Sequence, residues 1–207
     1  NSSSGIVDIY PLSSMQQLMF NHYGKNKGEI GVYHSQVCYK IITDLFDKKA
    51  FIAALNRLVK RHTCFNIGVN LAIHSNQQFI REETIFTIDE NDLSCMDKAS
   101  QGLFITTYMT NDKLQPFNVN DQHQPLFRFA LFYLDDNTFQ FFIALHHAIE
   151  DGWGIVEFLK DLFDTYAHIK NGIYCDVPRL PNVHKLFIEY EHSCADSQKH
   201  RTFWLNY

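Results

Sequence analysis

The sequence lacks closely spaced cysteines, basic blocks and long apolar runs, and each absence excludes a class of protein. Its five cysteines are widely spaced, which argues against a disulfide framework or a zinc ribbon and favours a reducing, cytoplasmic location. Its formal charge of −5 comes from interspersed acidic and basic residues, which argues against nucleic acid and an anionic membrane surface as main partners. No apolar run approaches the roughly 20 residues that span a bilayer.

The residues that are present suit a packed core, because 45% of the 207 residues are apolar and 14% are aromatic. Residues 1–8 have neither the basic nor the apolar region of a signal peptide, and we expect them to be a linker or a scar left by cloning. The last five residues include Phe203, Trp204 and Tyr207, whereas chain ends are usually polar. We therefore expect the chain to end at a cut within a larger folded protein.

Apolar periodicity predicts helices and strands that do not alternate regularly, which indicates an α+β fold or a mixed sheet. Helices are predicted from a Ser13–Gln16 capping box, over 48–62 after an Asp47 cap, over 94–110, over 152–170, and after an Asn182 cap. Strands are predicted at 32–42, 64–73 and 78–88. Two apolar runs around the turn at 135–137 predict a hairpin buried on both faces.

Two adjacent histidines, His146 and His147, end the second strand of this hairpin. Side chains alternate along a strand, so the two rings are expected to point in opposite directions. The end of a strand is also where open α/β sheets tend to place chemistry. The residues alone leave His147 open as a catalytic base or a buried structural histidine, and they favour a structural His146.

Asp151 and Gly152 follow the histidines at the expected start of a helix. A carboxylate at this position is favoured by the free N–H groups of the helix, which by itself accounts for Asp151. Gly152 either makes a tight connection or offers its N–H group to an oxyanion beside His147. No metal site is expected, because the chain has no His-Glu-x-x-His pattern, and the missing Gly-x-Ser-x-Gly elbow disfavours a serine hydrolase.

The stretch "HHAIEDGWG", residues 146–154, resembles the His-His-x-x-x-Asp-Gly signature of condensation domains in nonribosomal peptide synthetases. Three further stretches resemble motifs of this family in the same order: "YPLSSMQQLMF", "LNRLVKRHTCF" and "PFNVNDQHQPLFRFAL". The family belongs to the chloramphenicol acetyltransferase-like superfamily. The resemblance thus implies an α/β two-layer sandwich, with a mixed and largely antiparallel sheet covered by helices. It covers only the first of two similar lobes, so residues 9–207 are expected to be the N-terminal lobe without its C-terminal partner.

The resemblance also implies a function. In this family two lobes form a V, and carrier proteins that bear phosphopantetheine thioesters dock at opposite mouths of the tunnel between them. The amine of an acceptor aminoacyl thioester attacks the donor thioester, which gives a peptide bond. His147 would orient or deprotonate the amine, His146 would brace the loop, and the N–H group of Gly152 would hold the oxyanion. The expected partners are donor and acceptor peptidyl carrier proteins, the missing lobe and neighbouring modules, with no cofactor bound directly.

One departure from the family pattern concerns Asp151, which the family pairs with the second arginine of Arg-His-Glu-x-Leu-Arg. Here that stretch begins at Arg61 and ends at Asn66, so the ion pair cannot form. Either Asp151 has another partner, with Arg128 or a helix N-terminus as candidates, or the site has relaxed. We expect Asn66, Arg61 and Arg128 to support the active site structurally. Gly154, where the family often has serine or cysteine, is taken as a minor departure.

Three alternatives stay open beside a condensation domain. One is a stand-alone acyltransferase that uses a coenzyme A or carrier thioester. Another is an epimerisation-type domain, whereas the aspartate of the signature makes cyclisation less favoured. The third is a degenerate lobe that serves as a docking platform, which Asn66 favours. In every case the isolated lobe is expected to be inactive, because half of the tunnel is absent.

Overall fold

The computed structural model describes residues 5–25, 31–69, 71, 76–174, 176–195 and 197–207. Its elements, in chain order, are β1 (Ile6–Pro11), α1 (Ser14–Lys25), β2 (His34–Ile42), α2 (Lys48–Arg61), the 3₁₀ helix η1 (Thr63–Asn66), β3 (Ile67–Val69), β4 (Gln77–Arg81), β5 (Ile88–Asp92), α3 (Lys98–Lys113), β6 (Phe127–Asp135), β7 (Thr138–His146), α4 (Gly152–Lys170), α5 (Val183–Ala195) and α6 (Gln198–Leu205).

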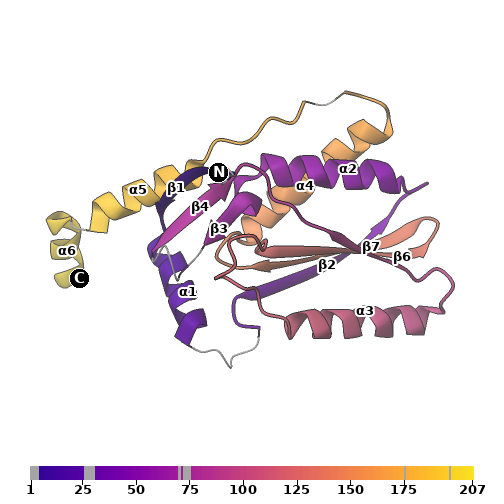
Figure 1. Cartoon of the computed structure of the whole chain (residues 1–207), viewed down its shortest axis with the longest axis horizontal. Helices are drawn as coiled ribbons and strands as arrows, with labels where there is room; N and C mark the ends of the chain where they lie inside the picture. Colours follow the sequence, from indigo (N-terminus) through magenta and orange to yellow (C-terminus); the bar gives the residue numbers. More distant parts are fainter. Residues whose placement is uncertain (1–4, 26–30, 70, 72–75, 175, 196) are drawn as a thin grey trace.

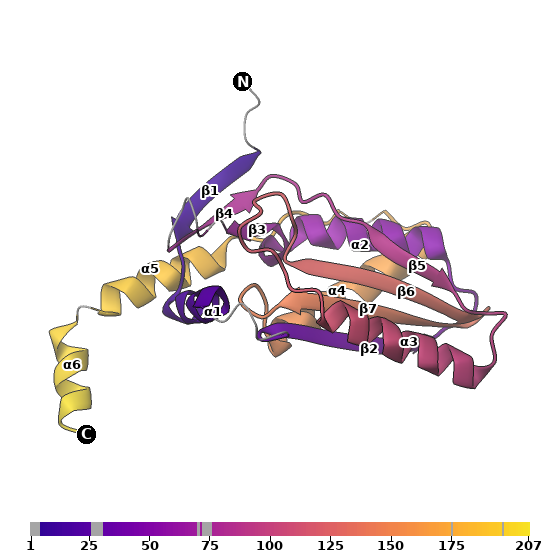
Figure 2. The same ribbon diagram turned by 60° about the horizontal axis from the view of Figure 1, so that its bottom comes forward.

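The main sheet has four strands in the order β2-β7-β6-β5 and is covered by helices on both faces (Figures 1 and 2). Its β5–β6 pair is parallel and its other pairs are antiparallel. Phe141 of β7 contacts Phe51 of α2, on the face that α2 and α4 cover, with ring centroids 5.3 Å apart. Phe142 contacts Tyr108 of α3 on the opposite face, at 5.5 Å. The sheet is therefore mixed and largely antiparallel, as the sequence predicts.

A second, antiparallel sheet in the order β1-β4-β3 lies beside α1 and α5 (Figure 1). Ile6 pairs with Arg81, and Asp8 pairs with Ile80. Residues 6–8 thus belong to a strand, and the expectation that they are linker is wrong. None of their side chains is buried, and β1 is held by its backbone pairing with β4, so apolar periodicity does not predict this strand.

Local sequence signals fix several helix starts. Asp47 accepts a hydrogen bond from the N–H group of Ala50 and caps α2, as predicted. The Ser13–Gln16 capping box is also present, with Ser13 Oγ 3.1 Å from the backbone nitrogen of Gln16 and Gln16 Oε1 2.9 Å from that of Ser13. The third helix begins at Lys98, four residues later than expected, because Asp97 is its cap.

The strand predicted at 64–73 is only partly correct. Residues 63–66 form η1, and only Ile67–Val69 form β3, while 70 and 72–75 lie outside the described residues. The side chain of Asn66 donates to the carbonyl oxygens of Val59 (2.8 Å) and His62 (3.2 Å). These bonds hold the chain against the end of α2, where an extended strand would carry it away.

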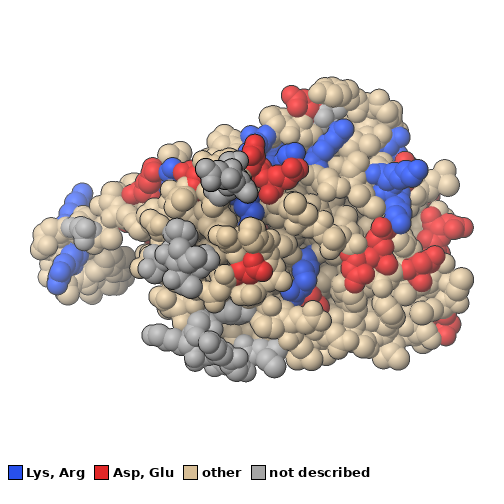
Figure 3. Space-filling view, viewed as in Figure 1, with Lys and Arg blue, Asp and Glu red and all other residues tan. Residues whose placement is uncertain are grey.

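The C-terminal helix α5 begins beside β1, where Lys185 pairs with Asp8, and α6 lies beyond the sheets (Figures 1 and 2). Their side chains include exposed Phe187, Tyr190, Phe203 and Trp204, and no residue of Gln198–Leu205 is buried. Among the described residues, no helix is long and apolar enough to cross a membrane. On the face shown in Figure 3, lysine and arginine are interspersed with aspartate and glutamate between broad uncharged areas.

Candidate active site

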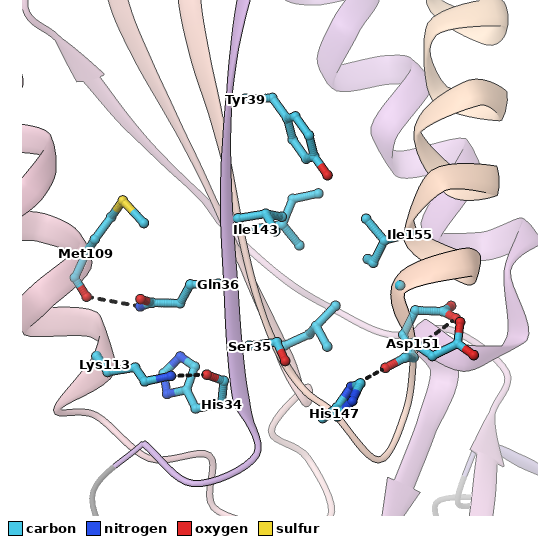
Figure 4. Close-up of a pocket in the computed structure, with 14 residues that line it drawn as sticks. His34, Ser35, Gln36, Tyr39, Met109, Lys113, Ile143, His147, Asp151 and Ile155 are labelled. Carbon is cyan, nitrogen blue, oxygen red and sulfur yellow. Dashed lines mark hydrogen bonds between the residues drawn. The ribbon is translucent and has the colours of Figure 1, made fainter.

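A cavity of about 580 Å³ lies where β2 and β7 meet the start of α4. The loop between β7 and α4 contributes His147, Glu150 and Asp151 to its lining, and Gly152 follows as the first residue of α4. Ser35 and Tyr39 lie on the α4 side of β2, whereas Gln36 and Lys113 lie on its α3 side (Figure 4). The cavity therefore reaches around β2, which is an edge strand of the main sheet.

His147 follows the last residue of β7 and is exposed to the cavity. Its backbone N–H group donates to the carbonyl oxygen of Tyr33 at 2.7 Å. Its ring nitrogen Nδ1 lies 3.0 Å from the carbonyl oxygen of Glu150 (Figure 4). A carbonyl oxygen only accepts, so Nδ1 carries the hydrogen and Nε2 of the neutral ring keeps a lone pair. The ring is thereby oriented to accept a proton through Nε2.

His146 points to the other face, as the alternation along the strand predicts. It is buried and stacks on Phe20 of α1, with ring centroids 4.9 Å apart. Its Nδ1 accepts a hydrogen bond from the backbone of Ala148 at 3.1 Å. Burial, followed by the nearby charges of His34 and His147, lowers the pKa of His146 to about 4. The neutral His146 ring can accept this hydrogen bond from Ala148, as a residue that braces the loop would.

Gln16 gives the same loop a second support that sequence reasoning missed. This buried residue donates from Nε2 to the carbonyl oxygen of Ala148 at 3.0 Å. It also exchanges hydrogen bonds with Gln78 of β4, which in turn donates to the carbonyl oxygen of Pro11. The sequence identified Gln16 only as a capping residue. The sequence does not predict this contact, because Gln78 lies in β4, far from Gln16 along the chain.

Asp151 caps α4. Its Oδ1 accepts a hydrogen bond from the backbone of Gly154 at 2.8 Å, and its side chain is exposed. Of the two replacement partners considered for this carboxylate, the helix N-terminus is therefore confirmed. An exposed capping carboxylate has no buried charge to compensate, so the missing family arginine leaves no unpaired ion here.

Arg128, the other candidate, is not a partner of Asp151. Its strand places it on the α3 side of the sheet, where its Nε lies 2.6 Å from Asp112 Oδ1. Asp112 Oδ2 also accepts from His34 at 2.8 Å and from Gln36 at 2.6 Å. Burial alone would raise the pKa of Asp112, but these hydrogen bonds outweigh it and hold the pKa below its usual range. The network fixes the β2 rim of the cavity through His34 and Gln36.

Arg61 and Asn66 lie outside the cavity lining, and their structural support of the active site stays a prediction. Arg61 Nε lies 3.0 Å from Oδ2 of Asp161 in α4, and His62 Nε2 lies 3.1 Å from the same oxygen. This cluster ties α2 to α4. Asn66 is fully buried and donates to carbonyl oxygens at the end of α2. Arg61 thus supports the contact between α2 and α4, whereas Asn66 supports the end of α2.

Glu150 lines the cavity and was not singled out from the sequence. Its half-buried carboxylate accepts from the backbone of Asp151 at 3.2 Å and forms a hydrogen bond with the thiol of Cys64. Burial raises the pKa of Glu150. A Cβ atom on Gly154 would lie only 1.6 Å from Glu150 Oε1. The glycine at 154 is therefore not a minor departure, because it makes the space that the carboxylate fills.

Comparisons with known proteins agree on one family. The sequence matches the family model of the condensation domain over residues 6–207. It is 32% identical over 172 residues to a plipastatin synthase of Bacillus subtilis, a match that covers 82% of this chain and 7% of that protein. It is 25% identical over 209 residues to the AMB antimetabolite synthetase AmbE of Pseudomonas aeruginosa, a match that covers 98% of this chain and 10% of that protein.

Solved structures show the same fold. The starter condensation domain of rhizomide synthetase RzmA matches with a TM-score of 0.81 at 17% identity, over 97% of this chain and 50% of that chain. The first condensation domain of the calcium-dependent antibiotic synthetase, in complex with substrate analogue 2a, matches with a TM-score of 0.81 at 16% identity, over 95% of this chain and 46% of that chain. This chain thus spans about half of these solved chains and a tenth or less of the two synthetases. The chloramphenicol acetyltransferase-like fold is confirmed, and the chain belongs to the condensation domain family.

Proposed function

We propose that residues 6–207 are the N-terminal lobe of a condensation domain that forms amide bonds in a nonribosomal peptide synthetase. The observation that carries this proposal is the orientation of His147, whose Nδ1 is held by the carbonyl oxygen of Glu150 while its ring lies at the cavity. This arrangement leaves Nε2 to act on a ligand. The synthetases named above support the reaction class.

In the proposed reaction, the amine of an acceptor aminoacyl thioester attacks the carbonyl carbon of a donor thioester. A C–N bond forms, and His147 Nε2 takes the proton that the nitrogen loses. The C–S bond then breaks, and the proton passes to the leaving thiolate. The products are an amide and a free thiol, so atoms and charge balance.

Gly152 is proposed to stabilise the oxyanion that forms during this attack. A Cβ atom at this position would meet nothing within 4 Å among the described residues, and its φ is outside the left-handed region. Neither local packing nor backbone conformation therefore demands glycine here. Because glycine has no side chain, the N–H group of this first residue of α4 stays accessible from the cavity.

The proposed partners are two carrier proteins and a second lobe. We propose that the carriers deliver both substrates on phosphopantetheine, so that this lobe binds no cofactor of its own. The second lobe is supported by the share of solved condensation domain chains that this chain covers, 46–50% in the two described above. We also propose that the isolated lobe is inactive for this reason. The cytoplasmic location stays a prediction.

The test is product formation by the native protein that carries this chain, with donor and acceptor amino acids loaded on separate carrier proteins and the products identified by mass spectrometry. An amide that joins the two carrier-bound substrates supports the proposal. Transfer from a coenzyme A thioester to a free amine or alcohol would instead show a stand-alone acyltransferase. Inversion of a carrier-bound residue without amide formation would show epimerisation. If no pair of substrates gave a product, the proposal would fail and a docking platform would be the remaining function. The missing arginine does not favour that function, because Asp151 has its partner in the backbone of Gly154.

A further inference from the structure

Glu150 is a titratable group of the cavity lining that the mechanism above does not use. The exposed capping carboxylate of Asp151 is already committed to the first turn of α4 through its hydrogen bond with Gly154. The carboxylate of Glu150 is half-buried, lines the cavity and belongs to the residue whose backbone oxygen holds the His147 ring. Glu150 therefore orients the ring whose Nε2 accepts a proton, and it also brings a carboxylate to the cavity.

Three contacts fix the position of this carboxylate. The thiol of Cys64 forms a hydrogen bond with it from η1, and the backbone N–H group of Asp151 donates to Oε1. Gly154 leaves the space into which Oε1 fits, since a Cβ atom there would lie 1.6 Å away. Burial keeps the pKa of the Cys64 thiol well above its usual value, so the thiol stays neutral and serves only as a donor.

We propose that Glu150 receives the acceptor substrate by pairing with its ammonium group and taking the proton that must leave before the nitrogen can attack. This inference rests on the proposed amide-forming function. An α-amino group has a pKa of about 7.7–8.0, so most of the acceptor arrives as ammonium at neutral pH. Glu150 takes one proton and becomes a neutral carboxylic acid. The neutral amine then attacks, and His147 Nε2 takes the second proton and passes it to the thiolate. Glu150 finally releases its proton to water in the open cavity.

The surroundings of Glu150 suit this step. Burial, reinforced by the charge of Asp151, raises the pKa of the Glu150 carboxyl, against smaller lowering effects from its hydrogen bonds with Cys64 and the Asp151 backbone. A raised pKa brings the carboxyl closer to the pKa of the amine and eases the transfer. The cavity lining holds further titratable groups, which are His147 and Asp151 on the same loop, His34 and Tyr39 on β2, and Lys113 at the end of α3, while Gly154 of α4 brings no charge.

The test compares wild type with Glu150→Gln in single-turnover amide formation by the native protein, between pH 6 and pH 9 and at limiting acceptor carrier. Without a proton acceptor at 150, the rate should follow the neutral fraction of the amine, which is about 5% at pH 6.5. The variant should therefore be about tenfold slower than wild type at pH 6.5 and within about threefold of it at pH 9. Glu150→Asp, which keeps the charge, should recover part of the loss at pH 6.5.

Two further variants separate this role from a structural one. Gly154→Ala should displace the carboxylate and reproduce the loss at pH 6.5, whereas Gly102→Ala in α3, where a Cβ atom meets nothing within 4 Å, should match wild type. Glu157→Gln, an exposed change on α4, should also match wild type. A ratio of wild type to Glu150→Gln that is constant across the pH range overturns the inference and leaves the proposed function intact. A wild type that forms no amide at any pH overturns both.

Discussion

His146 and His147 are adjacent in the chain, yet the strand end gives them opposite environments. One ring stacks on Phe20 inside the lobe, and the other is exposed at the cavity. Alternation along a strand is enough to predict this division from the sequence. The sequence does not predict the contact between Glu150 and Gly154. The carboxylate fills the space beside a glycine one turn away, and such a contact leaves no periodic pattern in the sequence.

The first prediction concerns the pH dependence of stability at His146. Its pKa is about 4 in the folded protein and about 6.5 when unfolded, so folding favours the neutral ring. The contribution of the neutral His146 ring to the free energy of unfolding should be fully present above about pH 6.5. It should fall, by up to about 3 kcal/mol, as the pH drops towards 4. Hydrogen exchange of the β7 amides measures this loss. His146→Gln should remove the part of the pH dependence that comes from this ring, whereas His168→Gln, at an exposed position of α4, should leave it unchanged.

The second prediction concerns Asn66, where the family has an arginine. Asn66 is fully buried and donates to the carbonyl oxygens of Val59 and His62. Asn66→Arg would place a larger, charged group there, and we expect it to destabilise the lobe by more than about 2 kcal/mol. Thermal unfolding measures the change, with Asn56→Arg on the exposed face of α2 as the control. A raised melting temperature would show that the arginine reaches Asp151 after all.

At the scale of elements, the sequence predicts those whose signals are local. The helix α2 and the β6–β7 hairpin were predicted by helical spacing, a capping aspartate and two apolar runs. The strands β1 and β3 were missed or overextended, because β1 is defined by pairing with a distant strand and β3 is shortened by the side-chain bonds of Asn66. The ion pair between Arg128 and Asp112 likewise depends on how α3 crosses the sheet.

The third prediction concerns the cap of α4. Asp151→Ala should remove the hydrogen bond to Gly154 and cost about 1 kcal/mol of stability, whereas Asp151→Asn should keep most of it because asparagine is also a good cap. Chemical denaturation measures both. Asp97→Ala, which uncaps α3 far from the histidines, provides a control with a similar loss and full amide formation. An Asp151→Asn variant that is stable but inactive would show that the carboxylate takes part in the chemistry.

At the scale of the whole molecule, the chain lines the cavity beside His147 and exposes aromatic side chains on its C-terminal helices. The exposed aromatic side chains of α5 and α6, together with a length of about half that of the solved condensation domain chains, agree with the proposal that a second lobe completes the cavity. The identity of the two substrates has no signal in this lobe alone.

The measurement that tests the account most directly is single-turnover amide formation by the native protein with His147→Ala. Removal of the group that takes the proton should slow the reaction by at least about a hundredfold, with an unchanged melting temperature because the ring is exposed. The matched change His168→Ala should leave the rate as it is in wild type. A folded His147→Ala variant that forms the amide at a nearly normal rate would contradict the account.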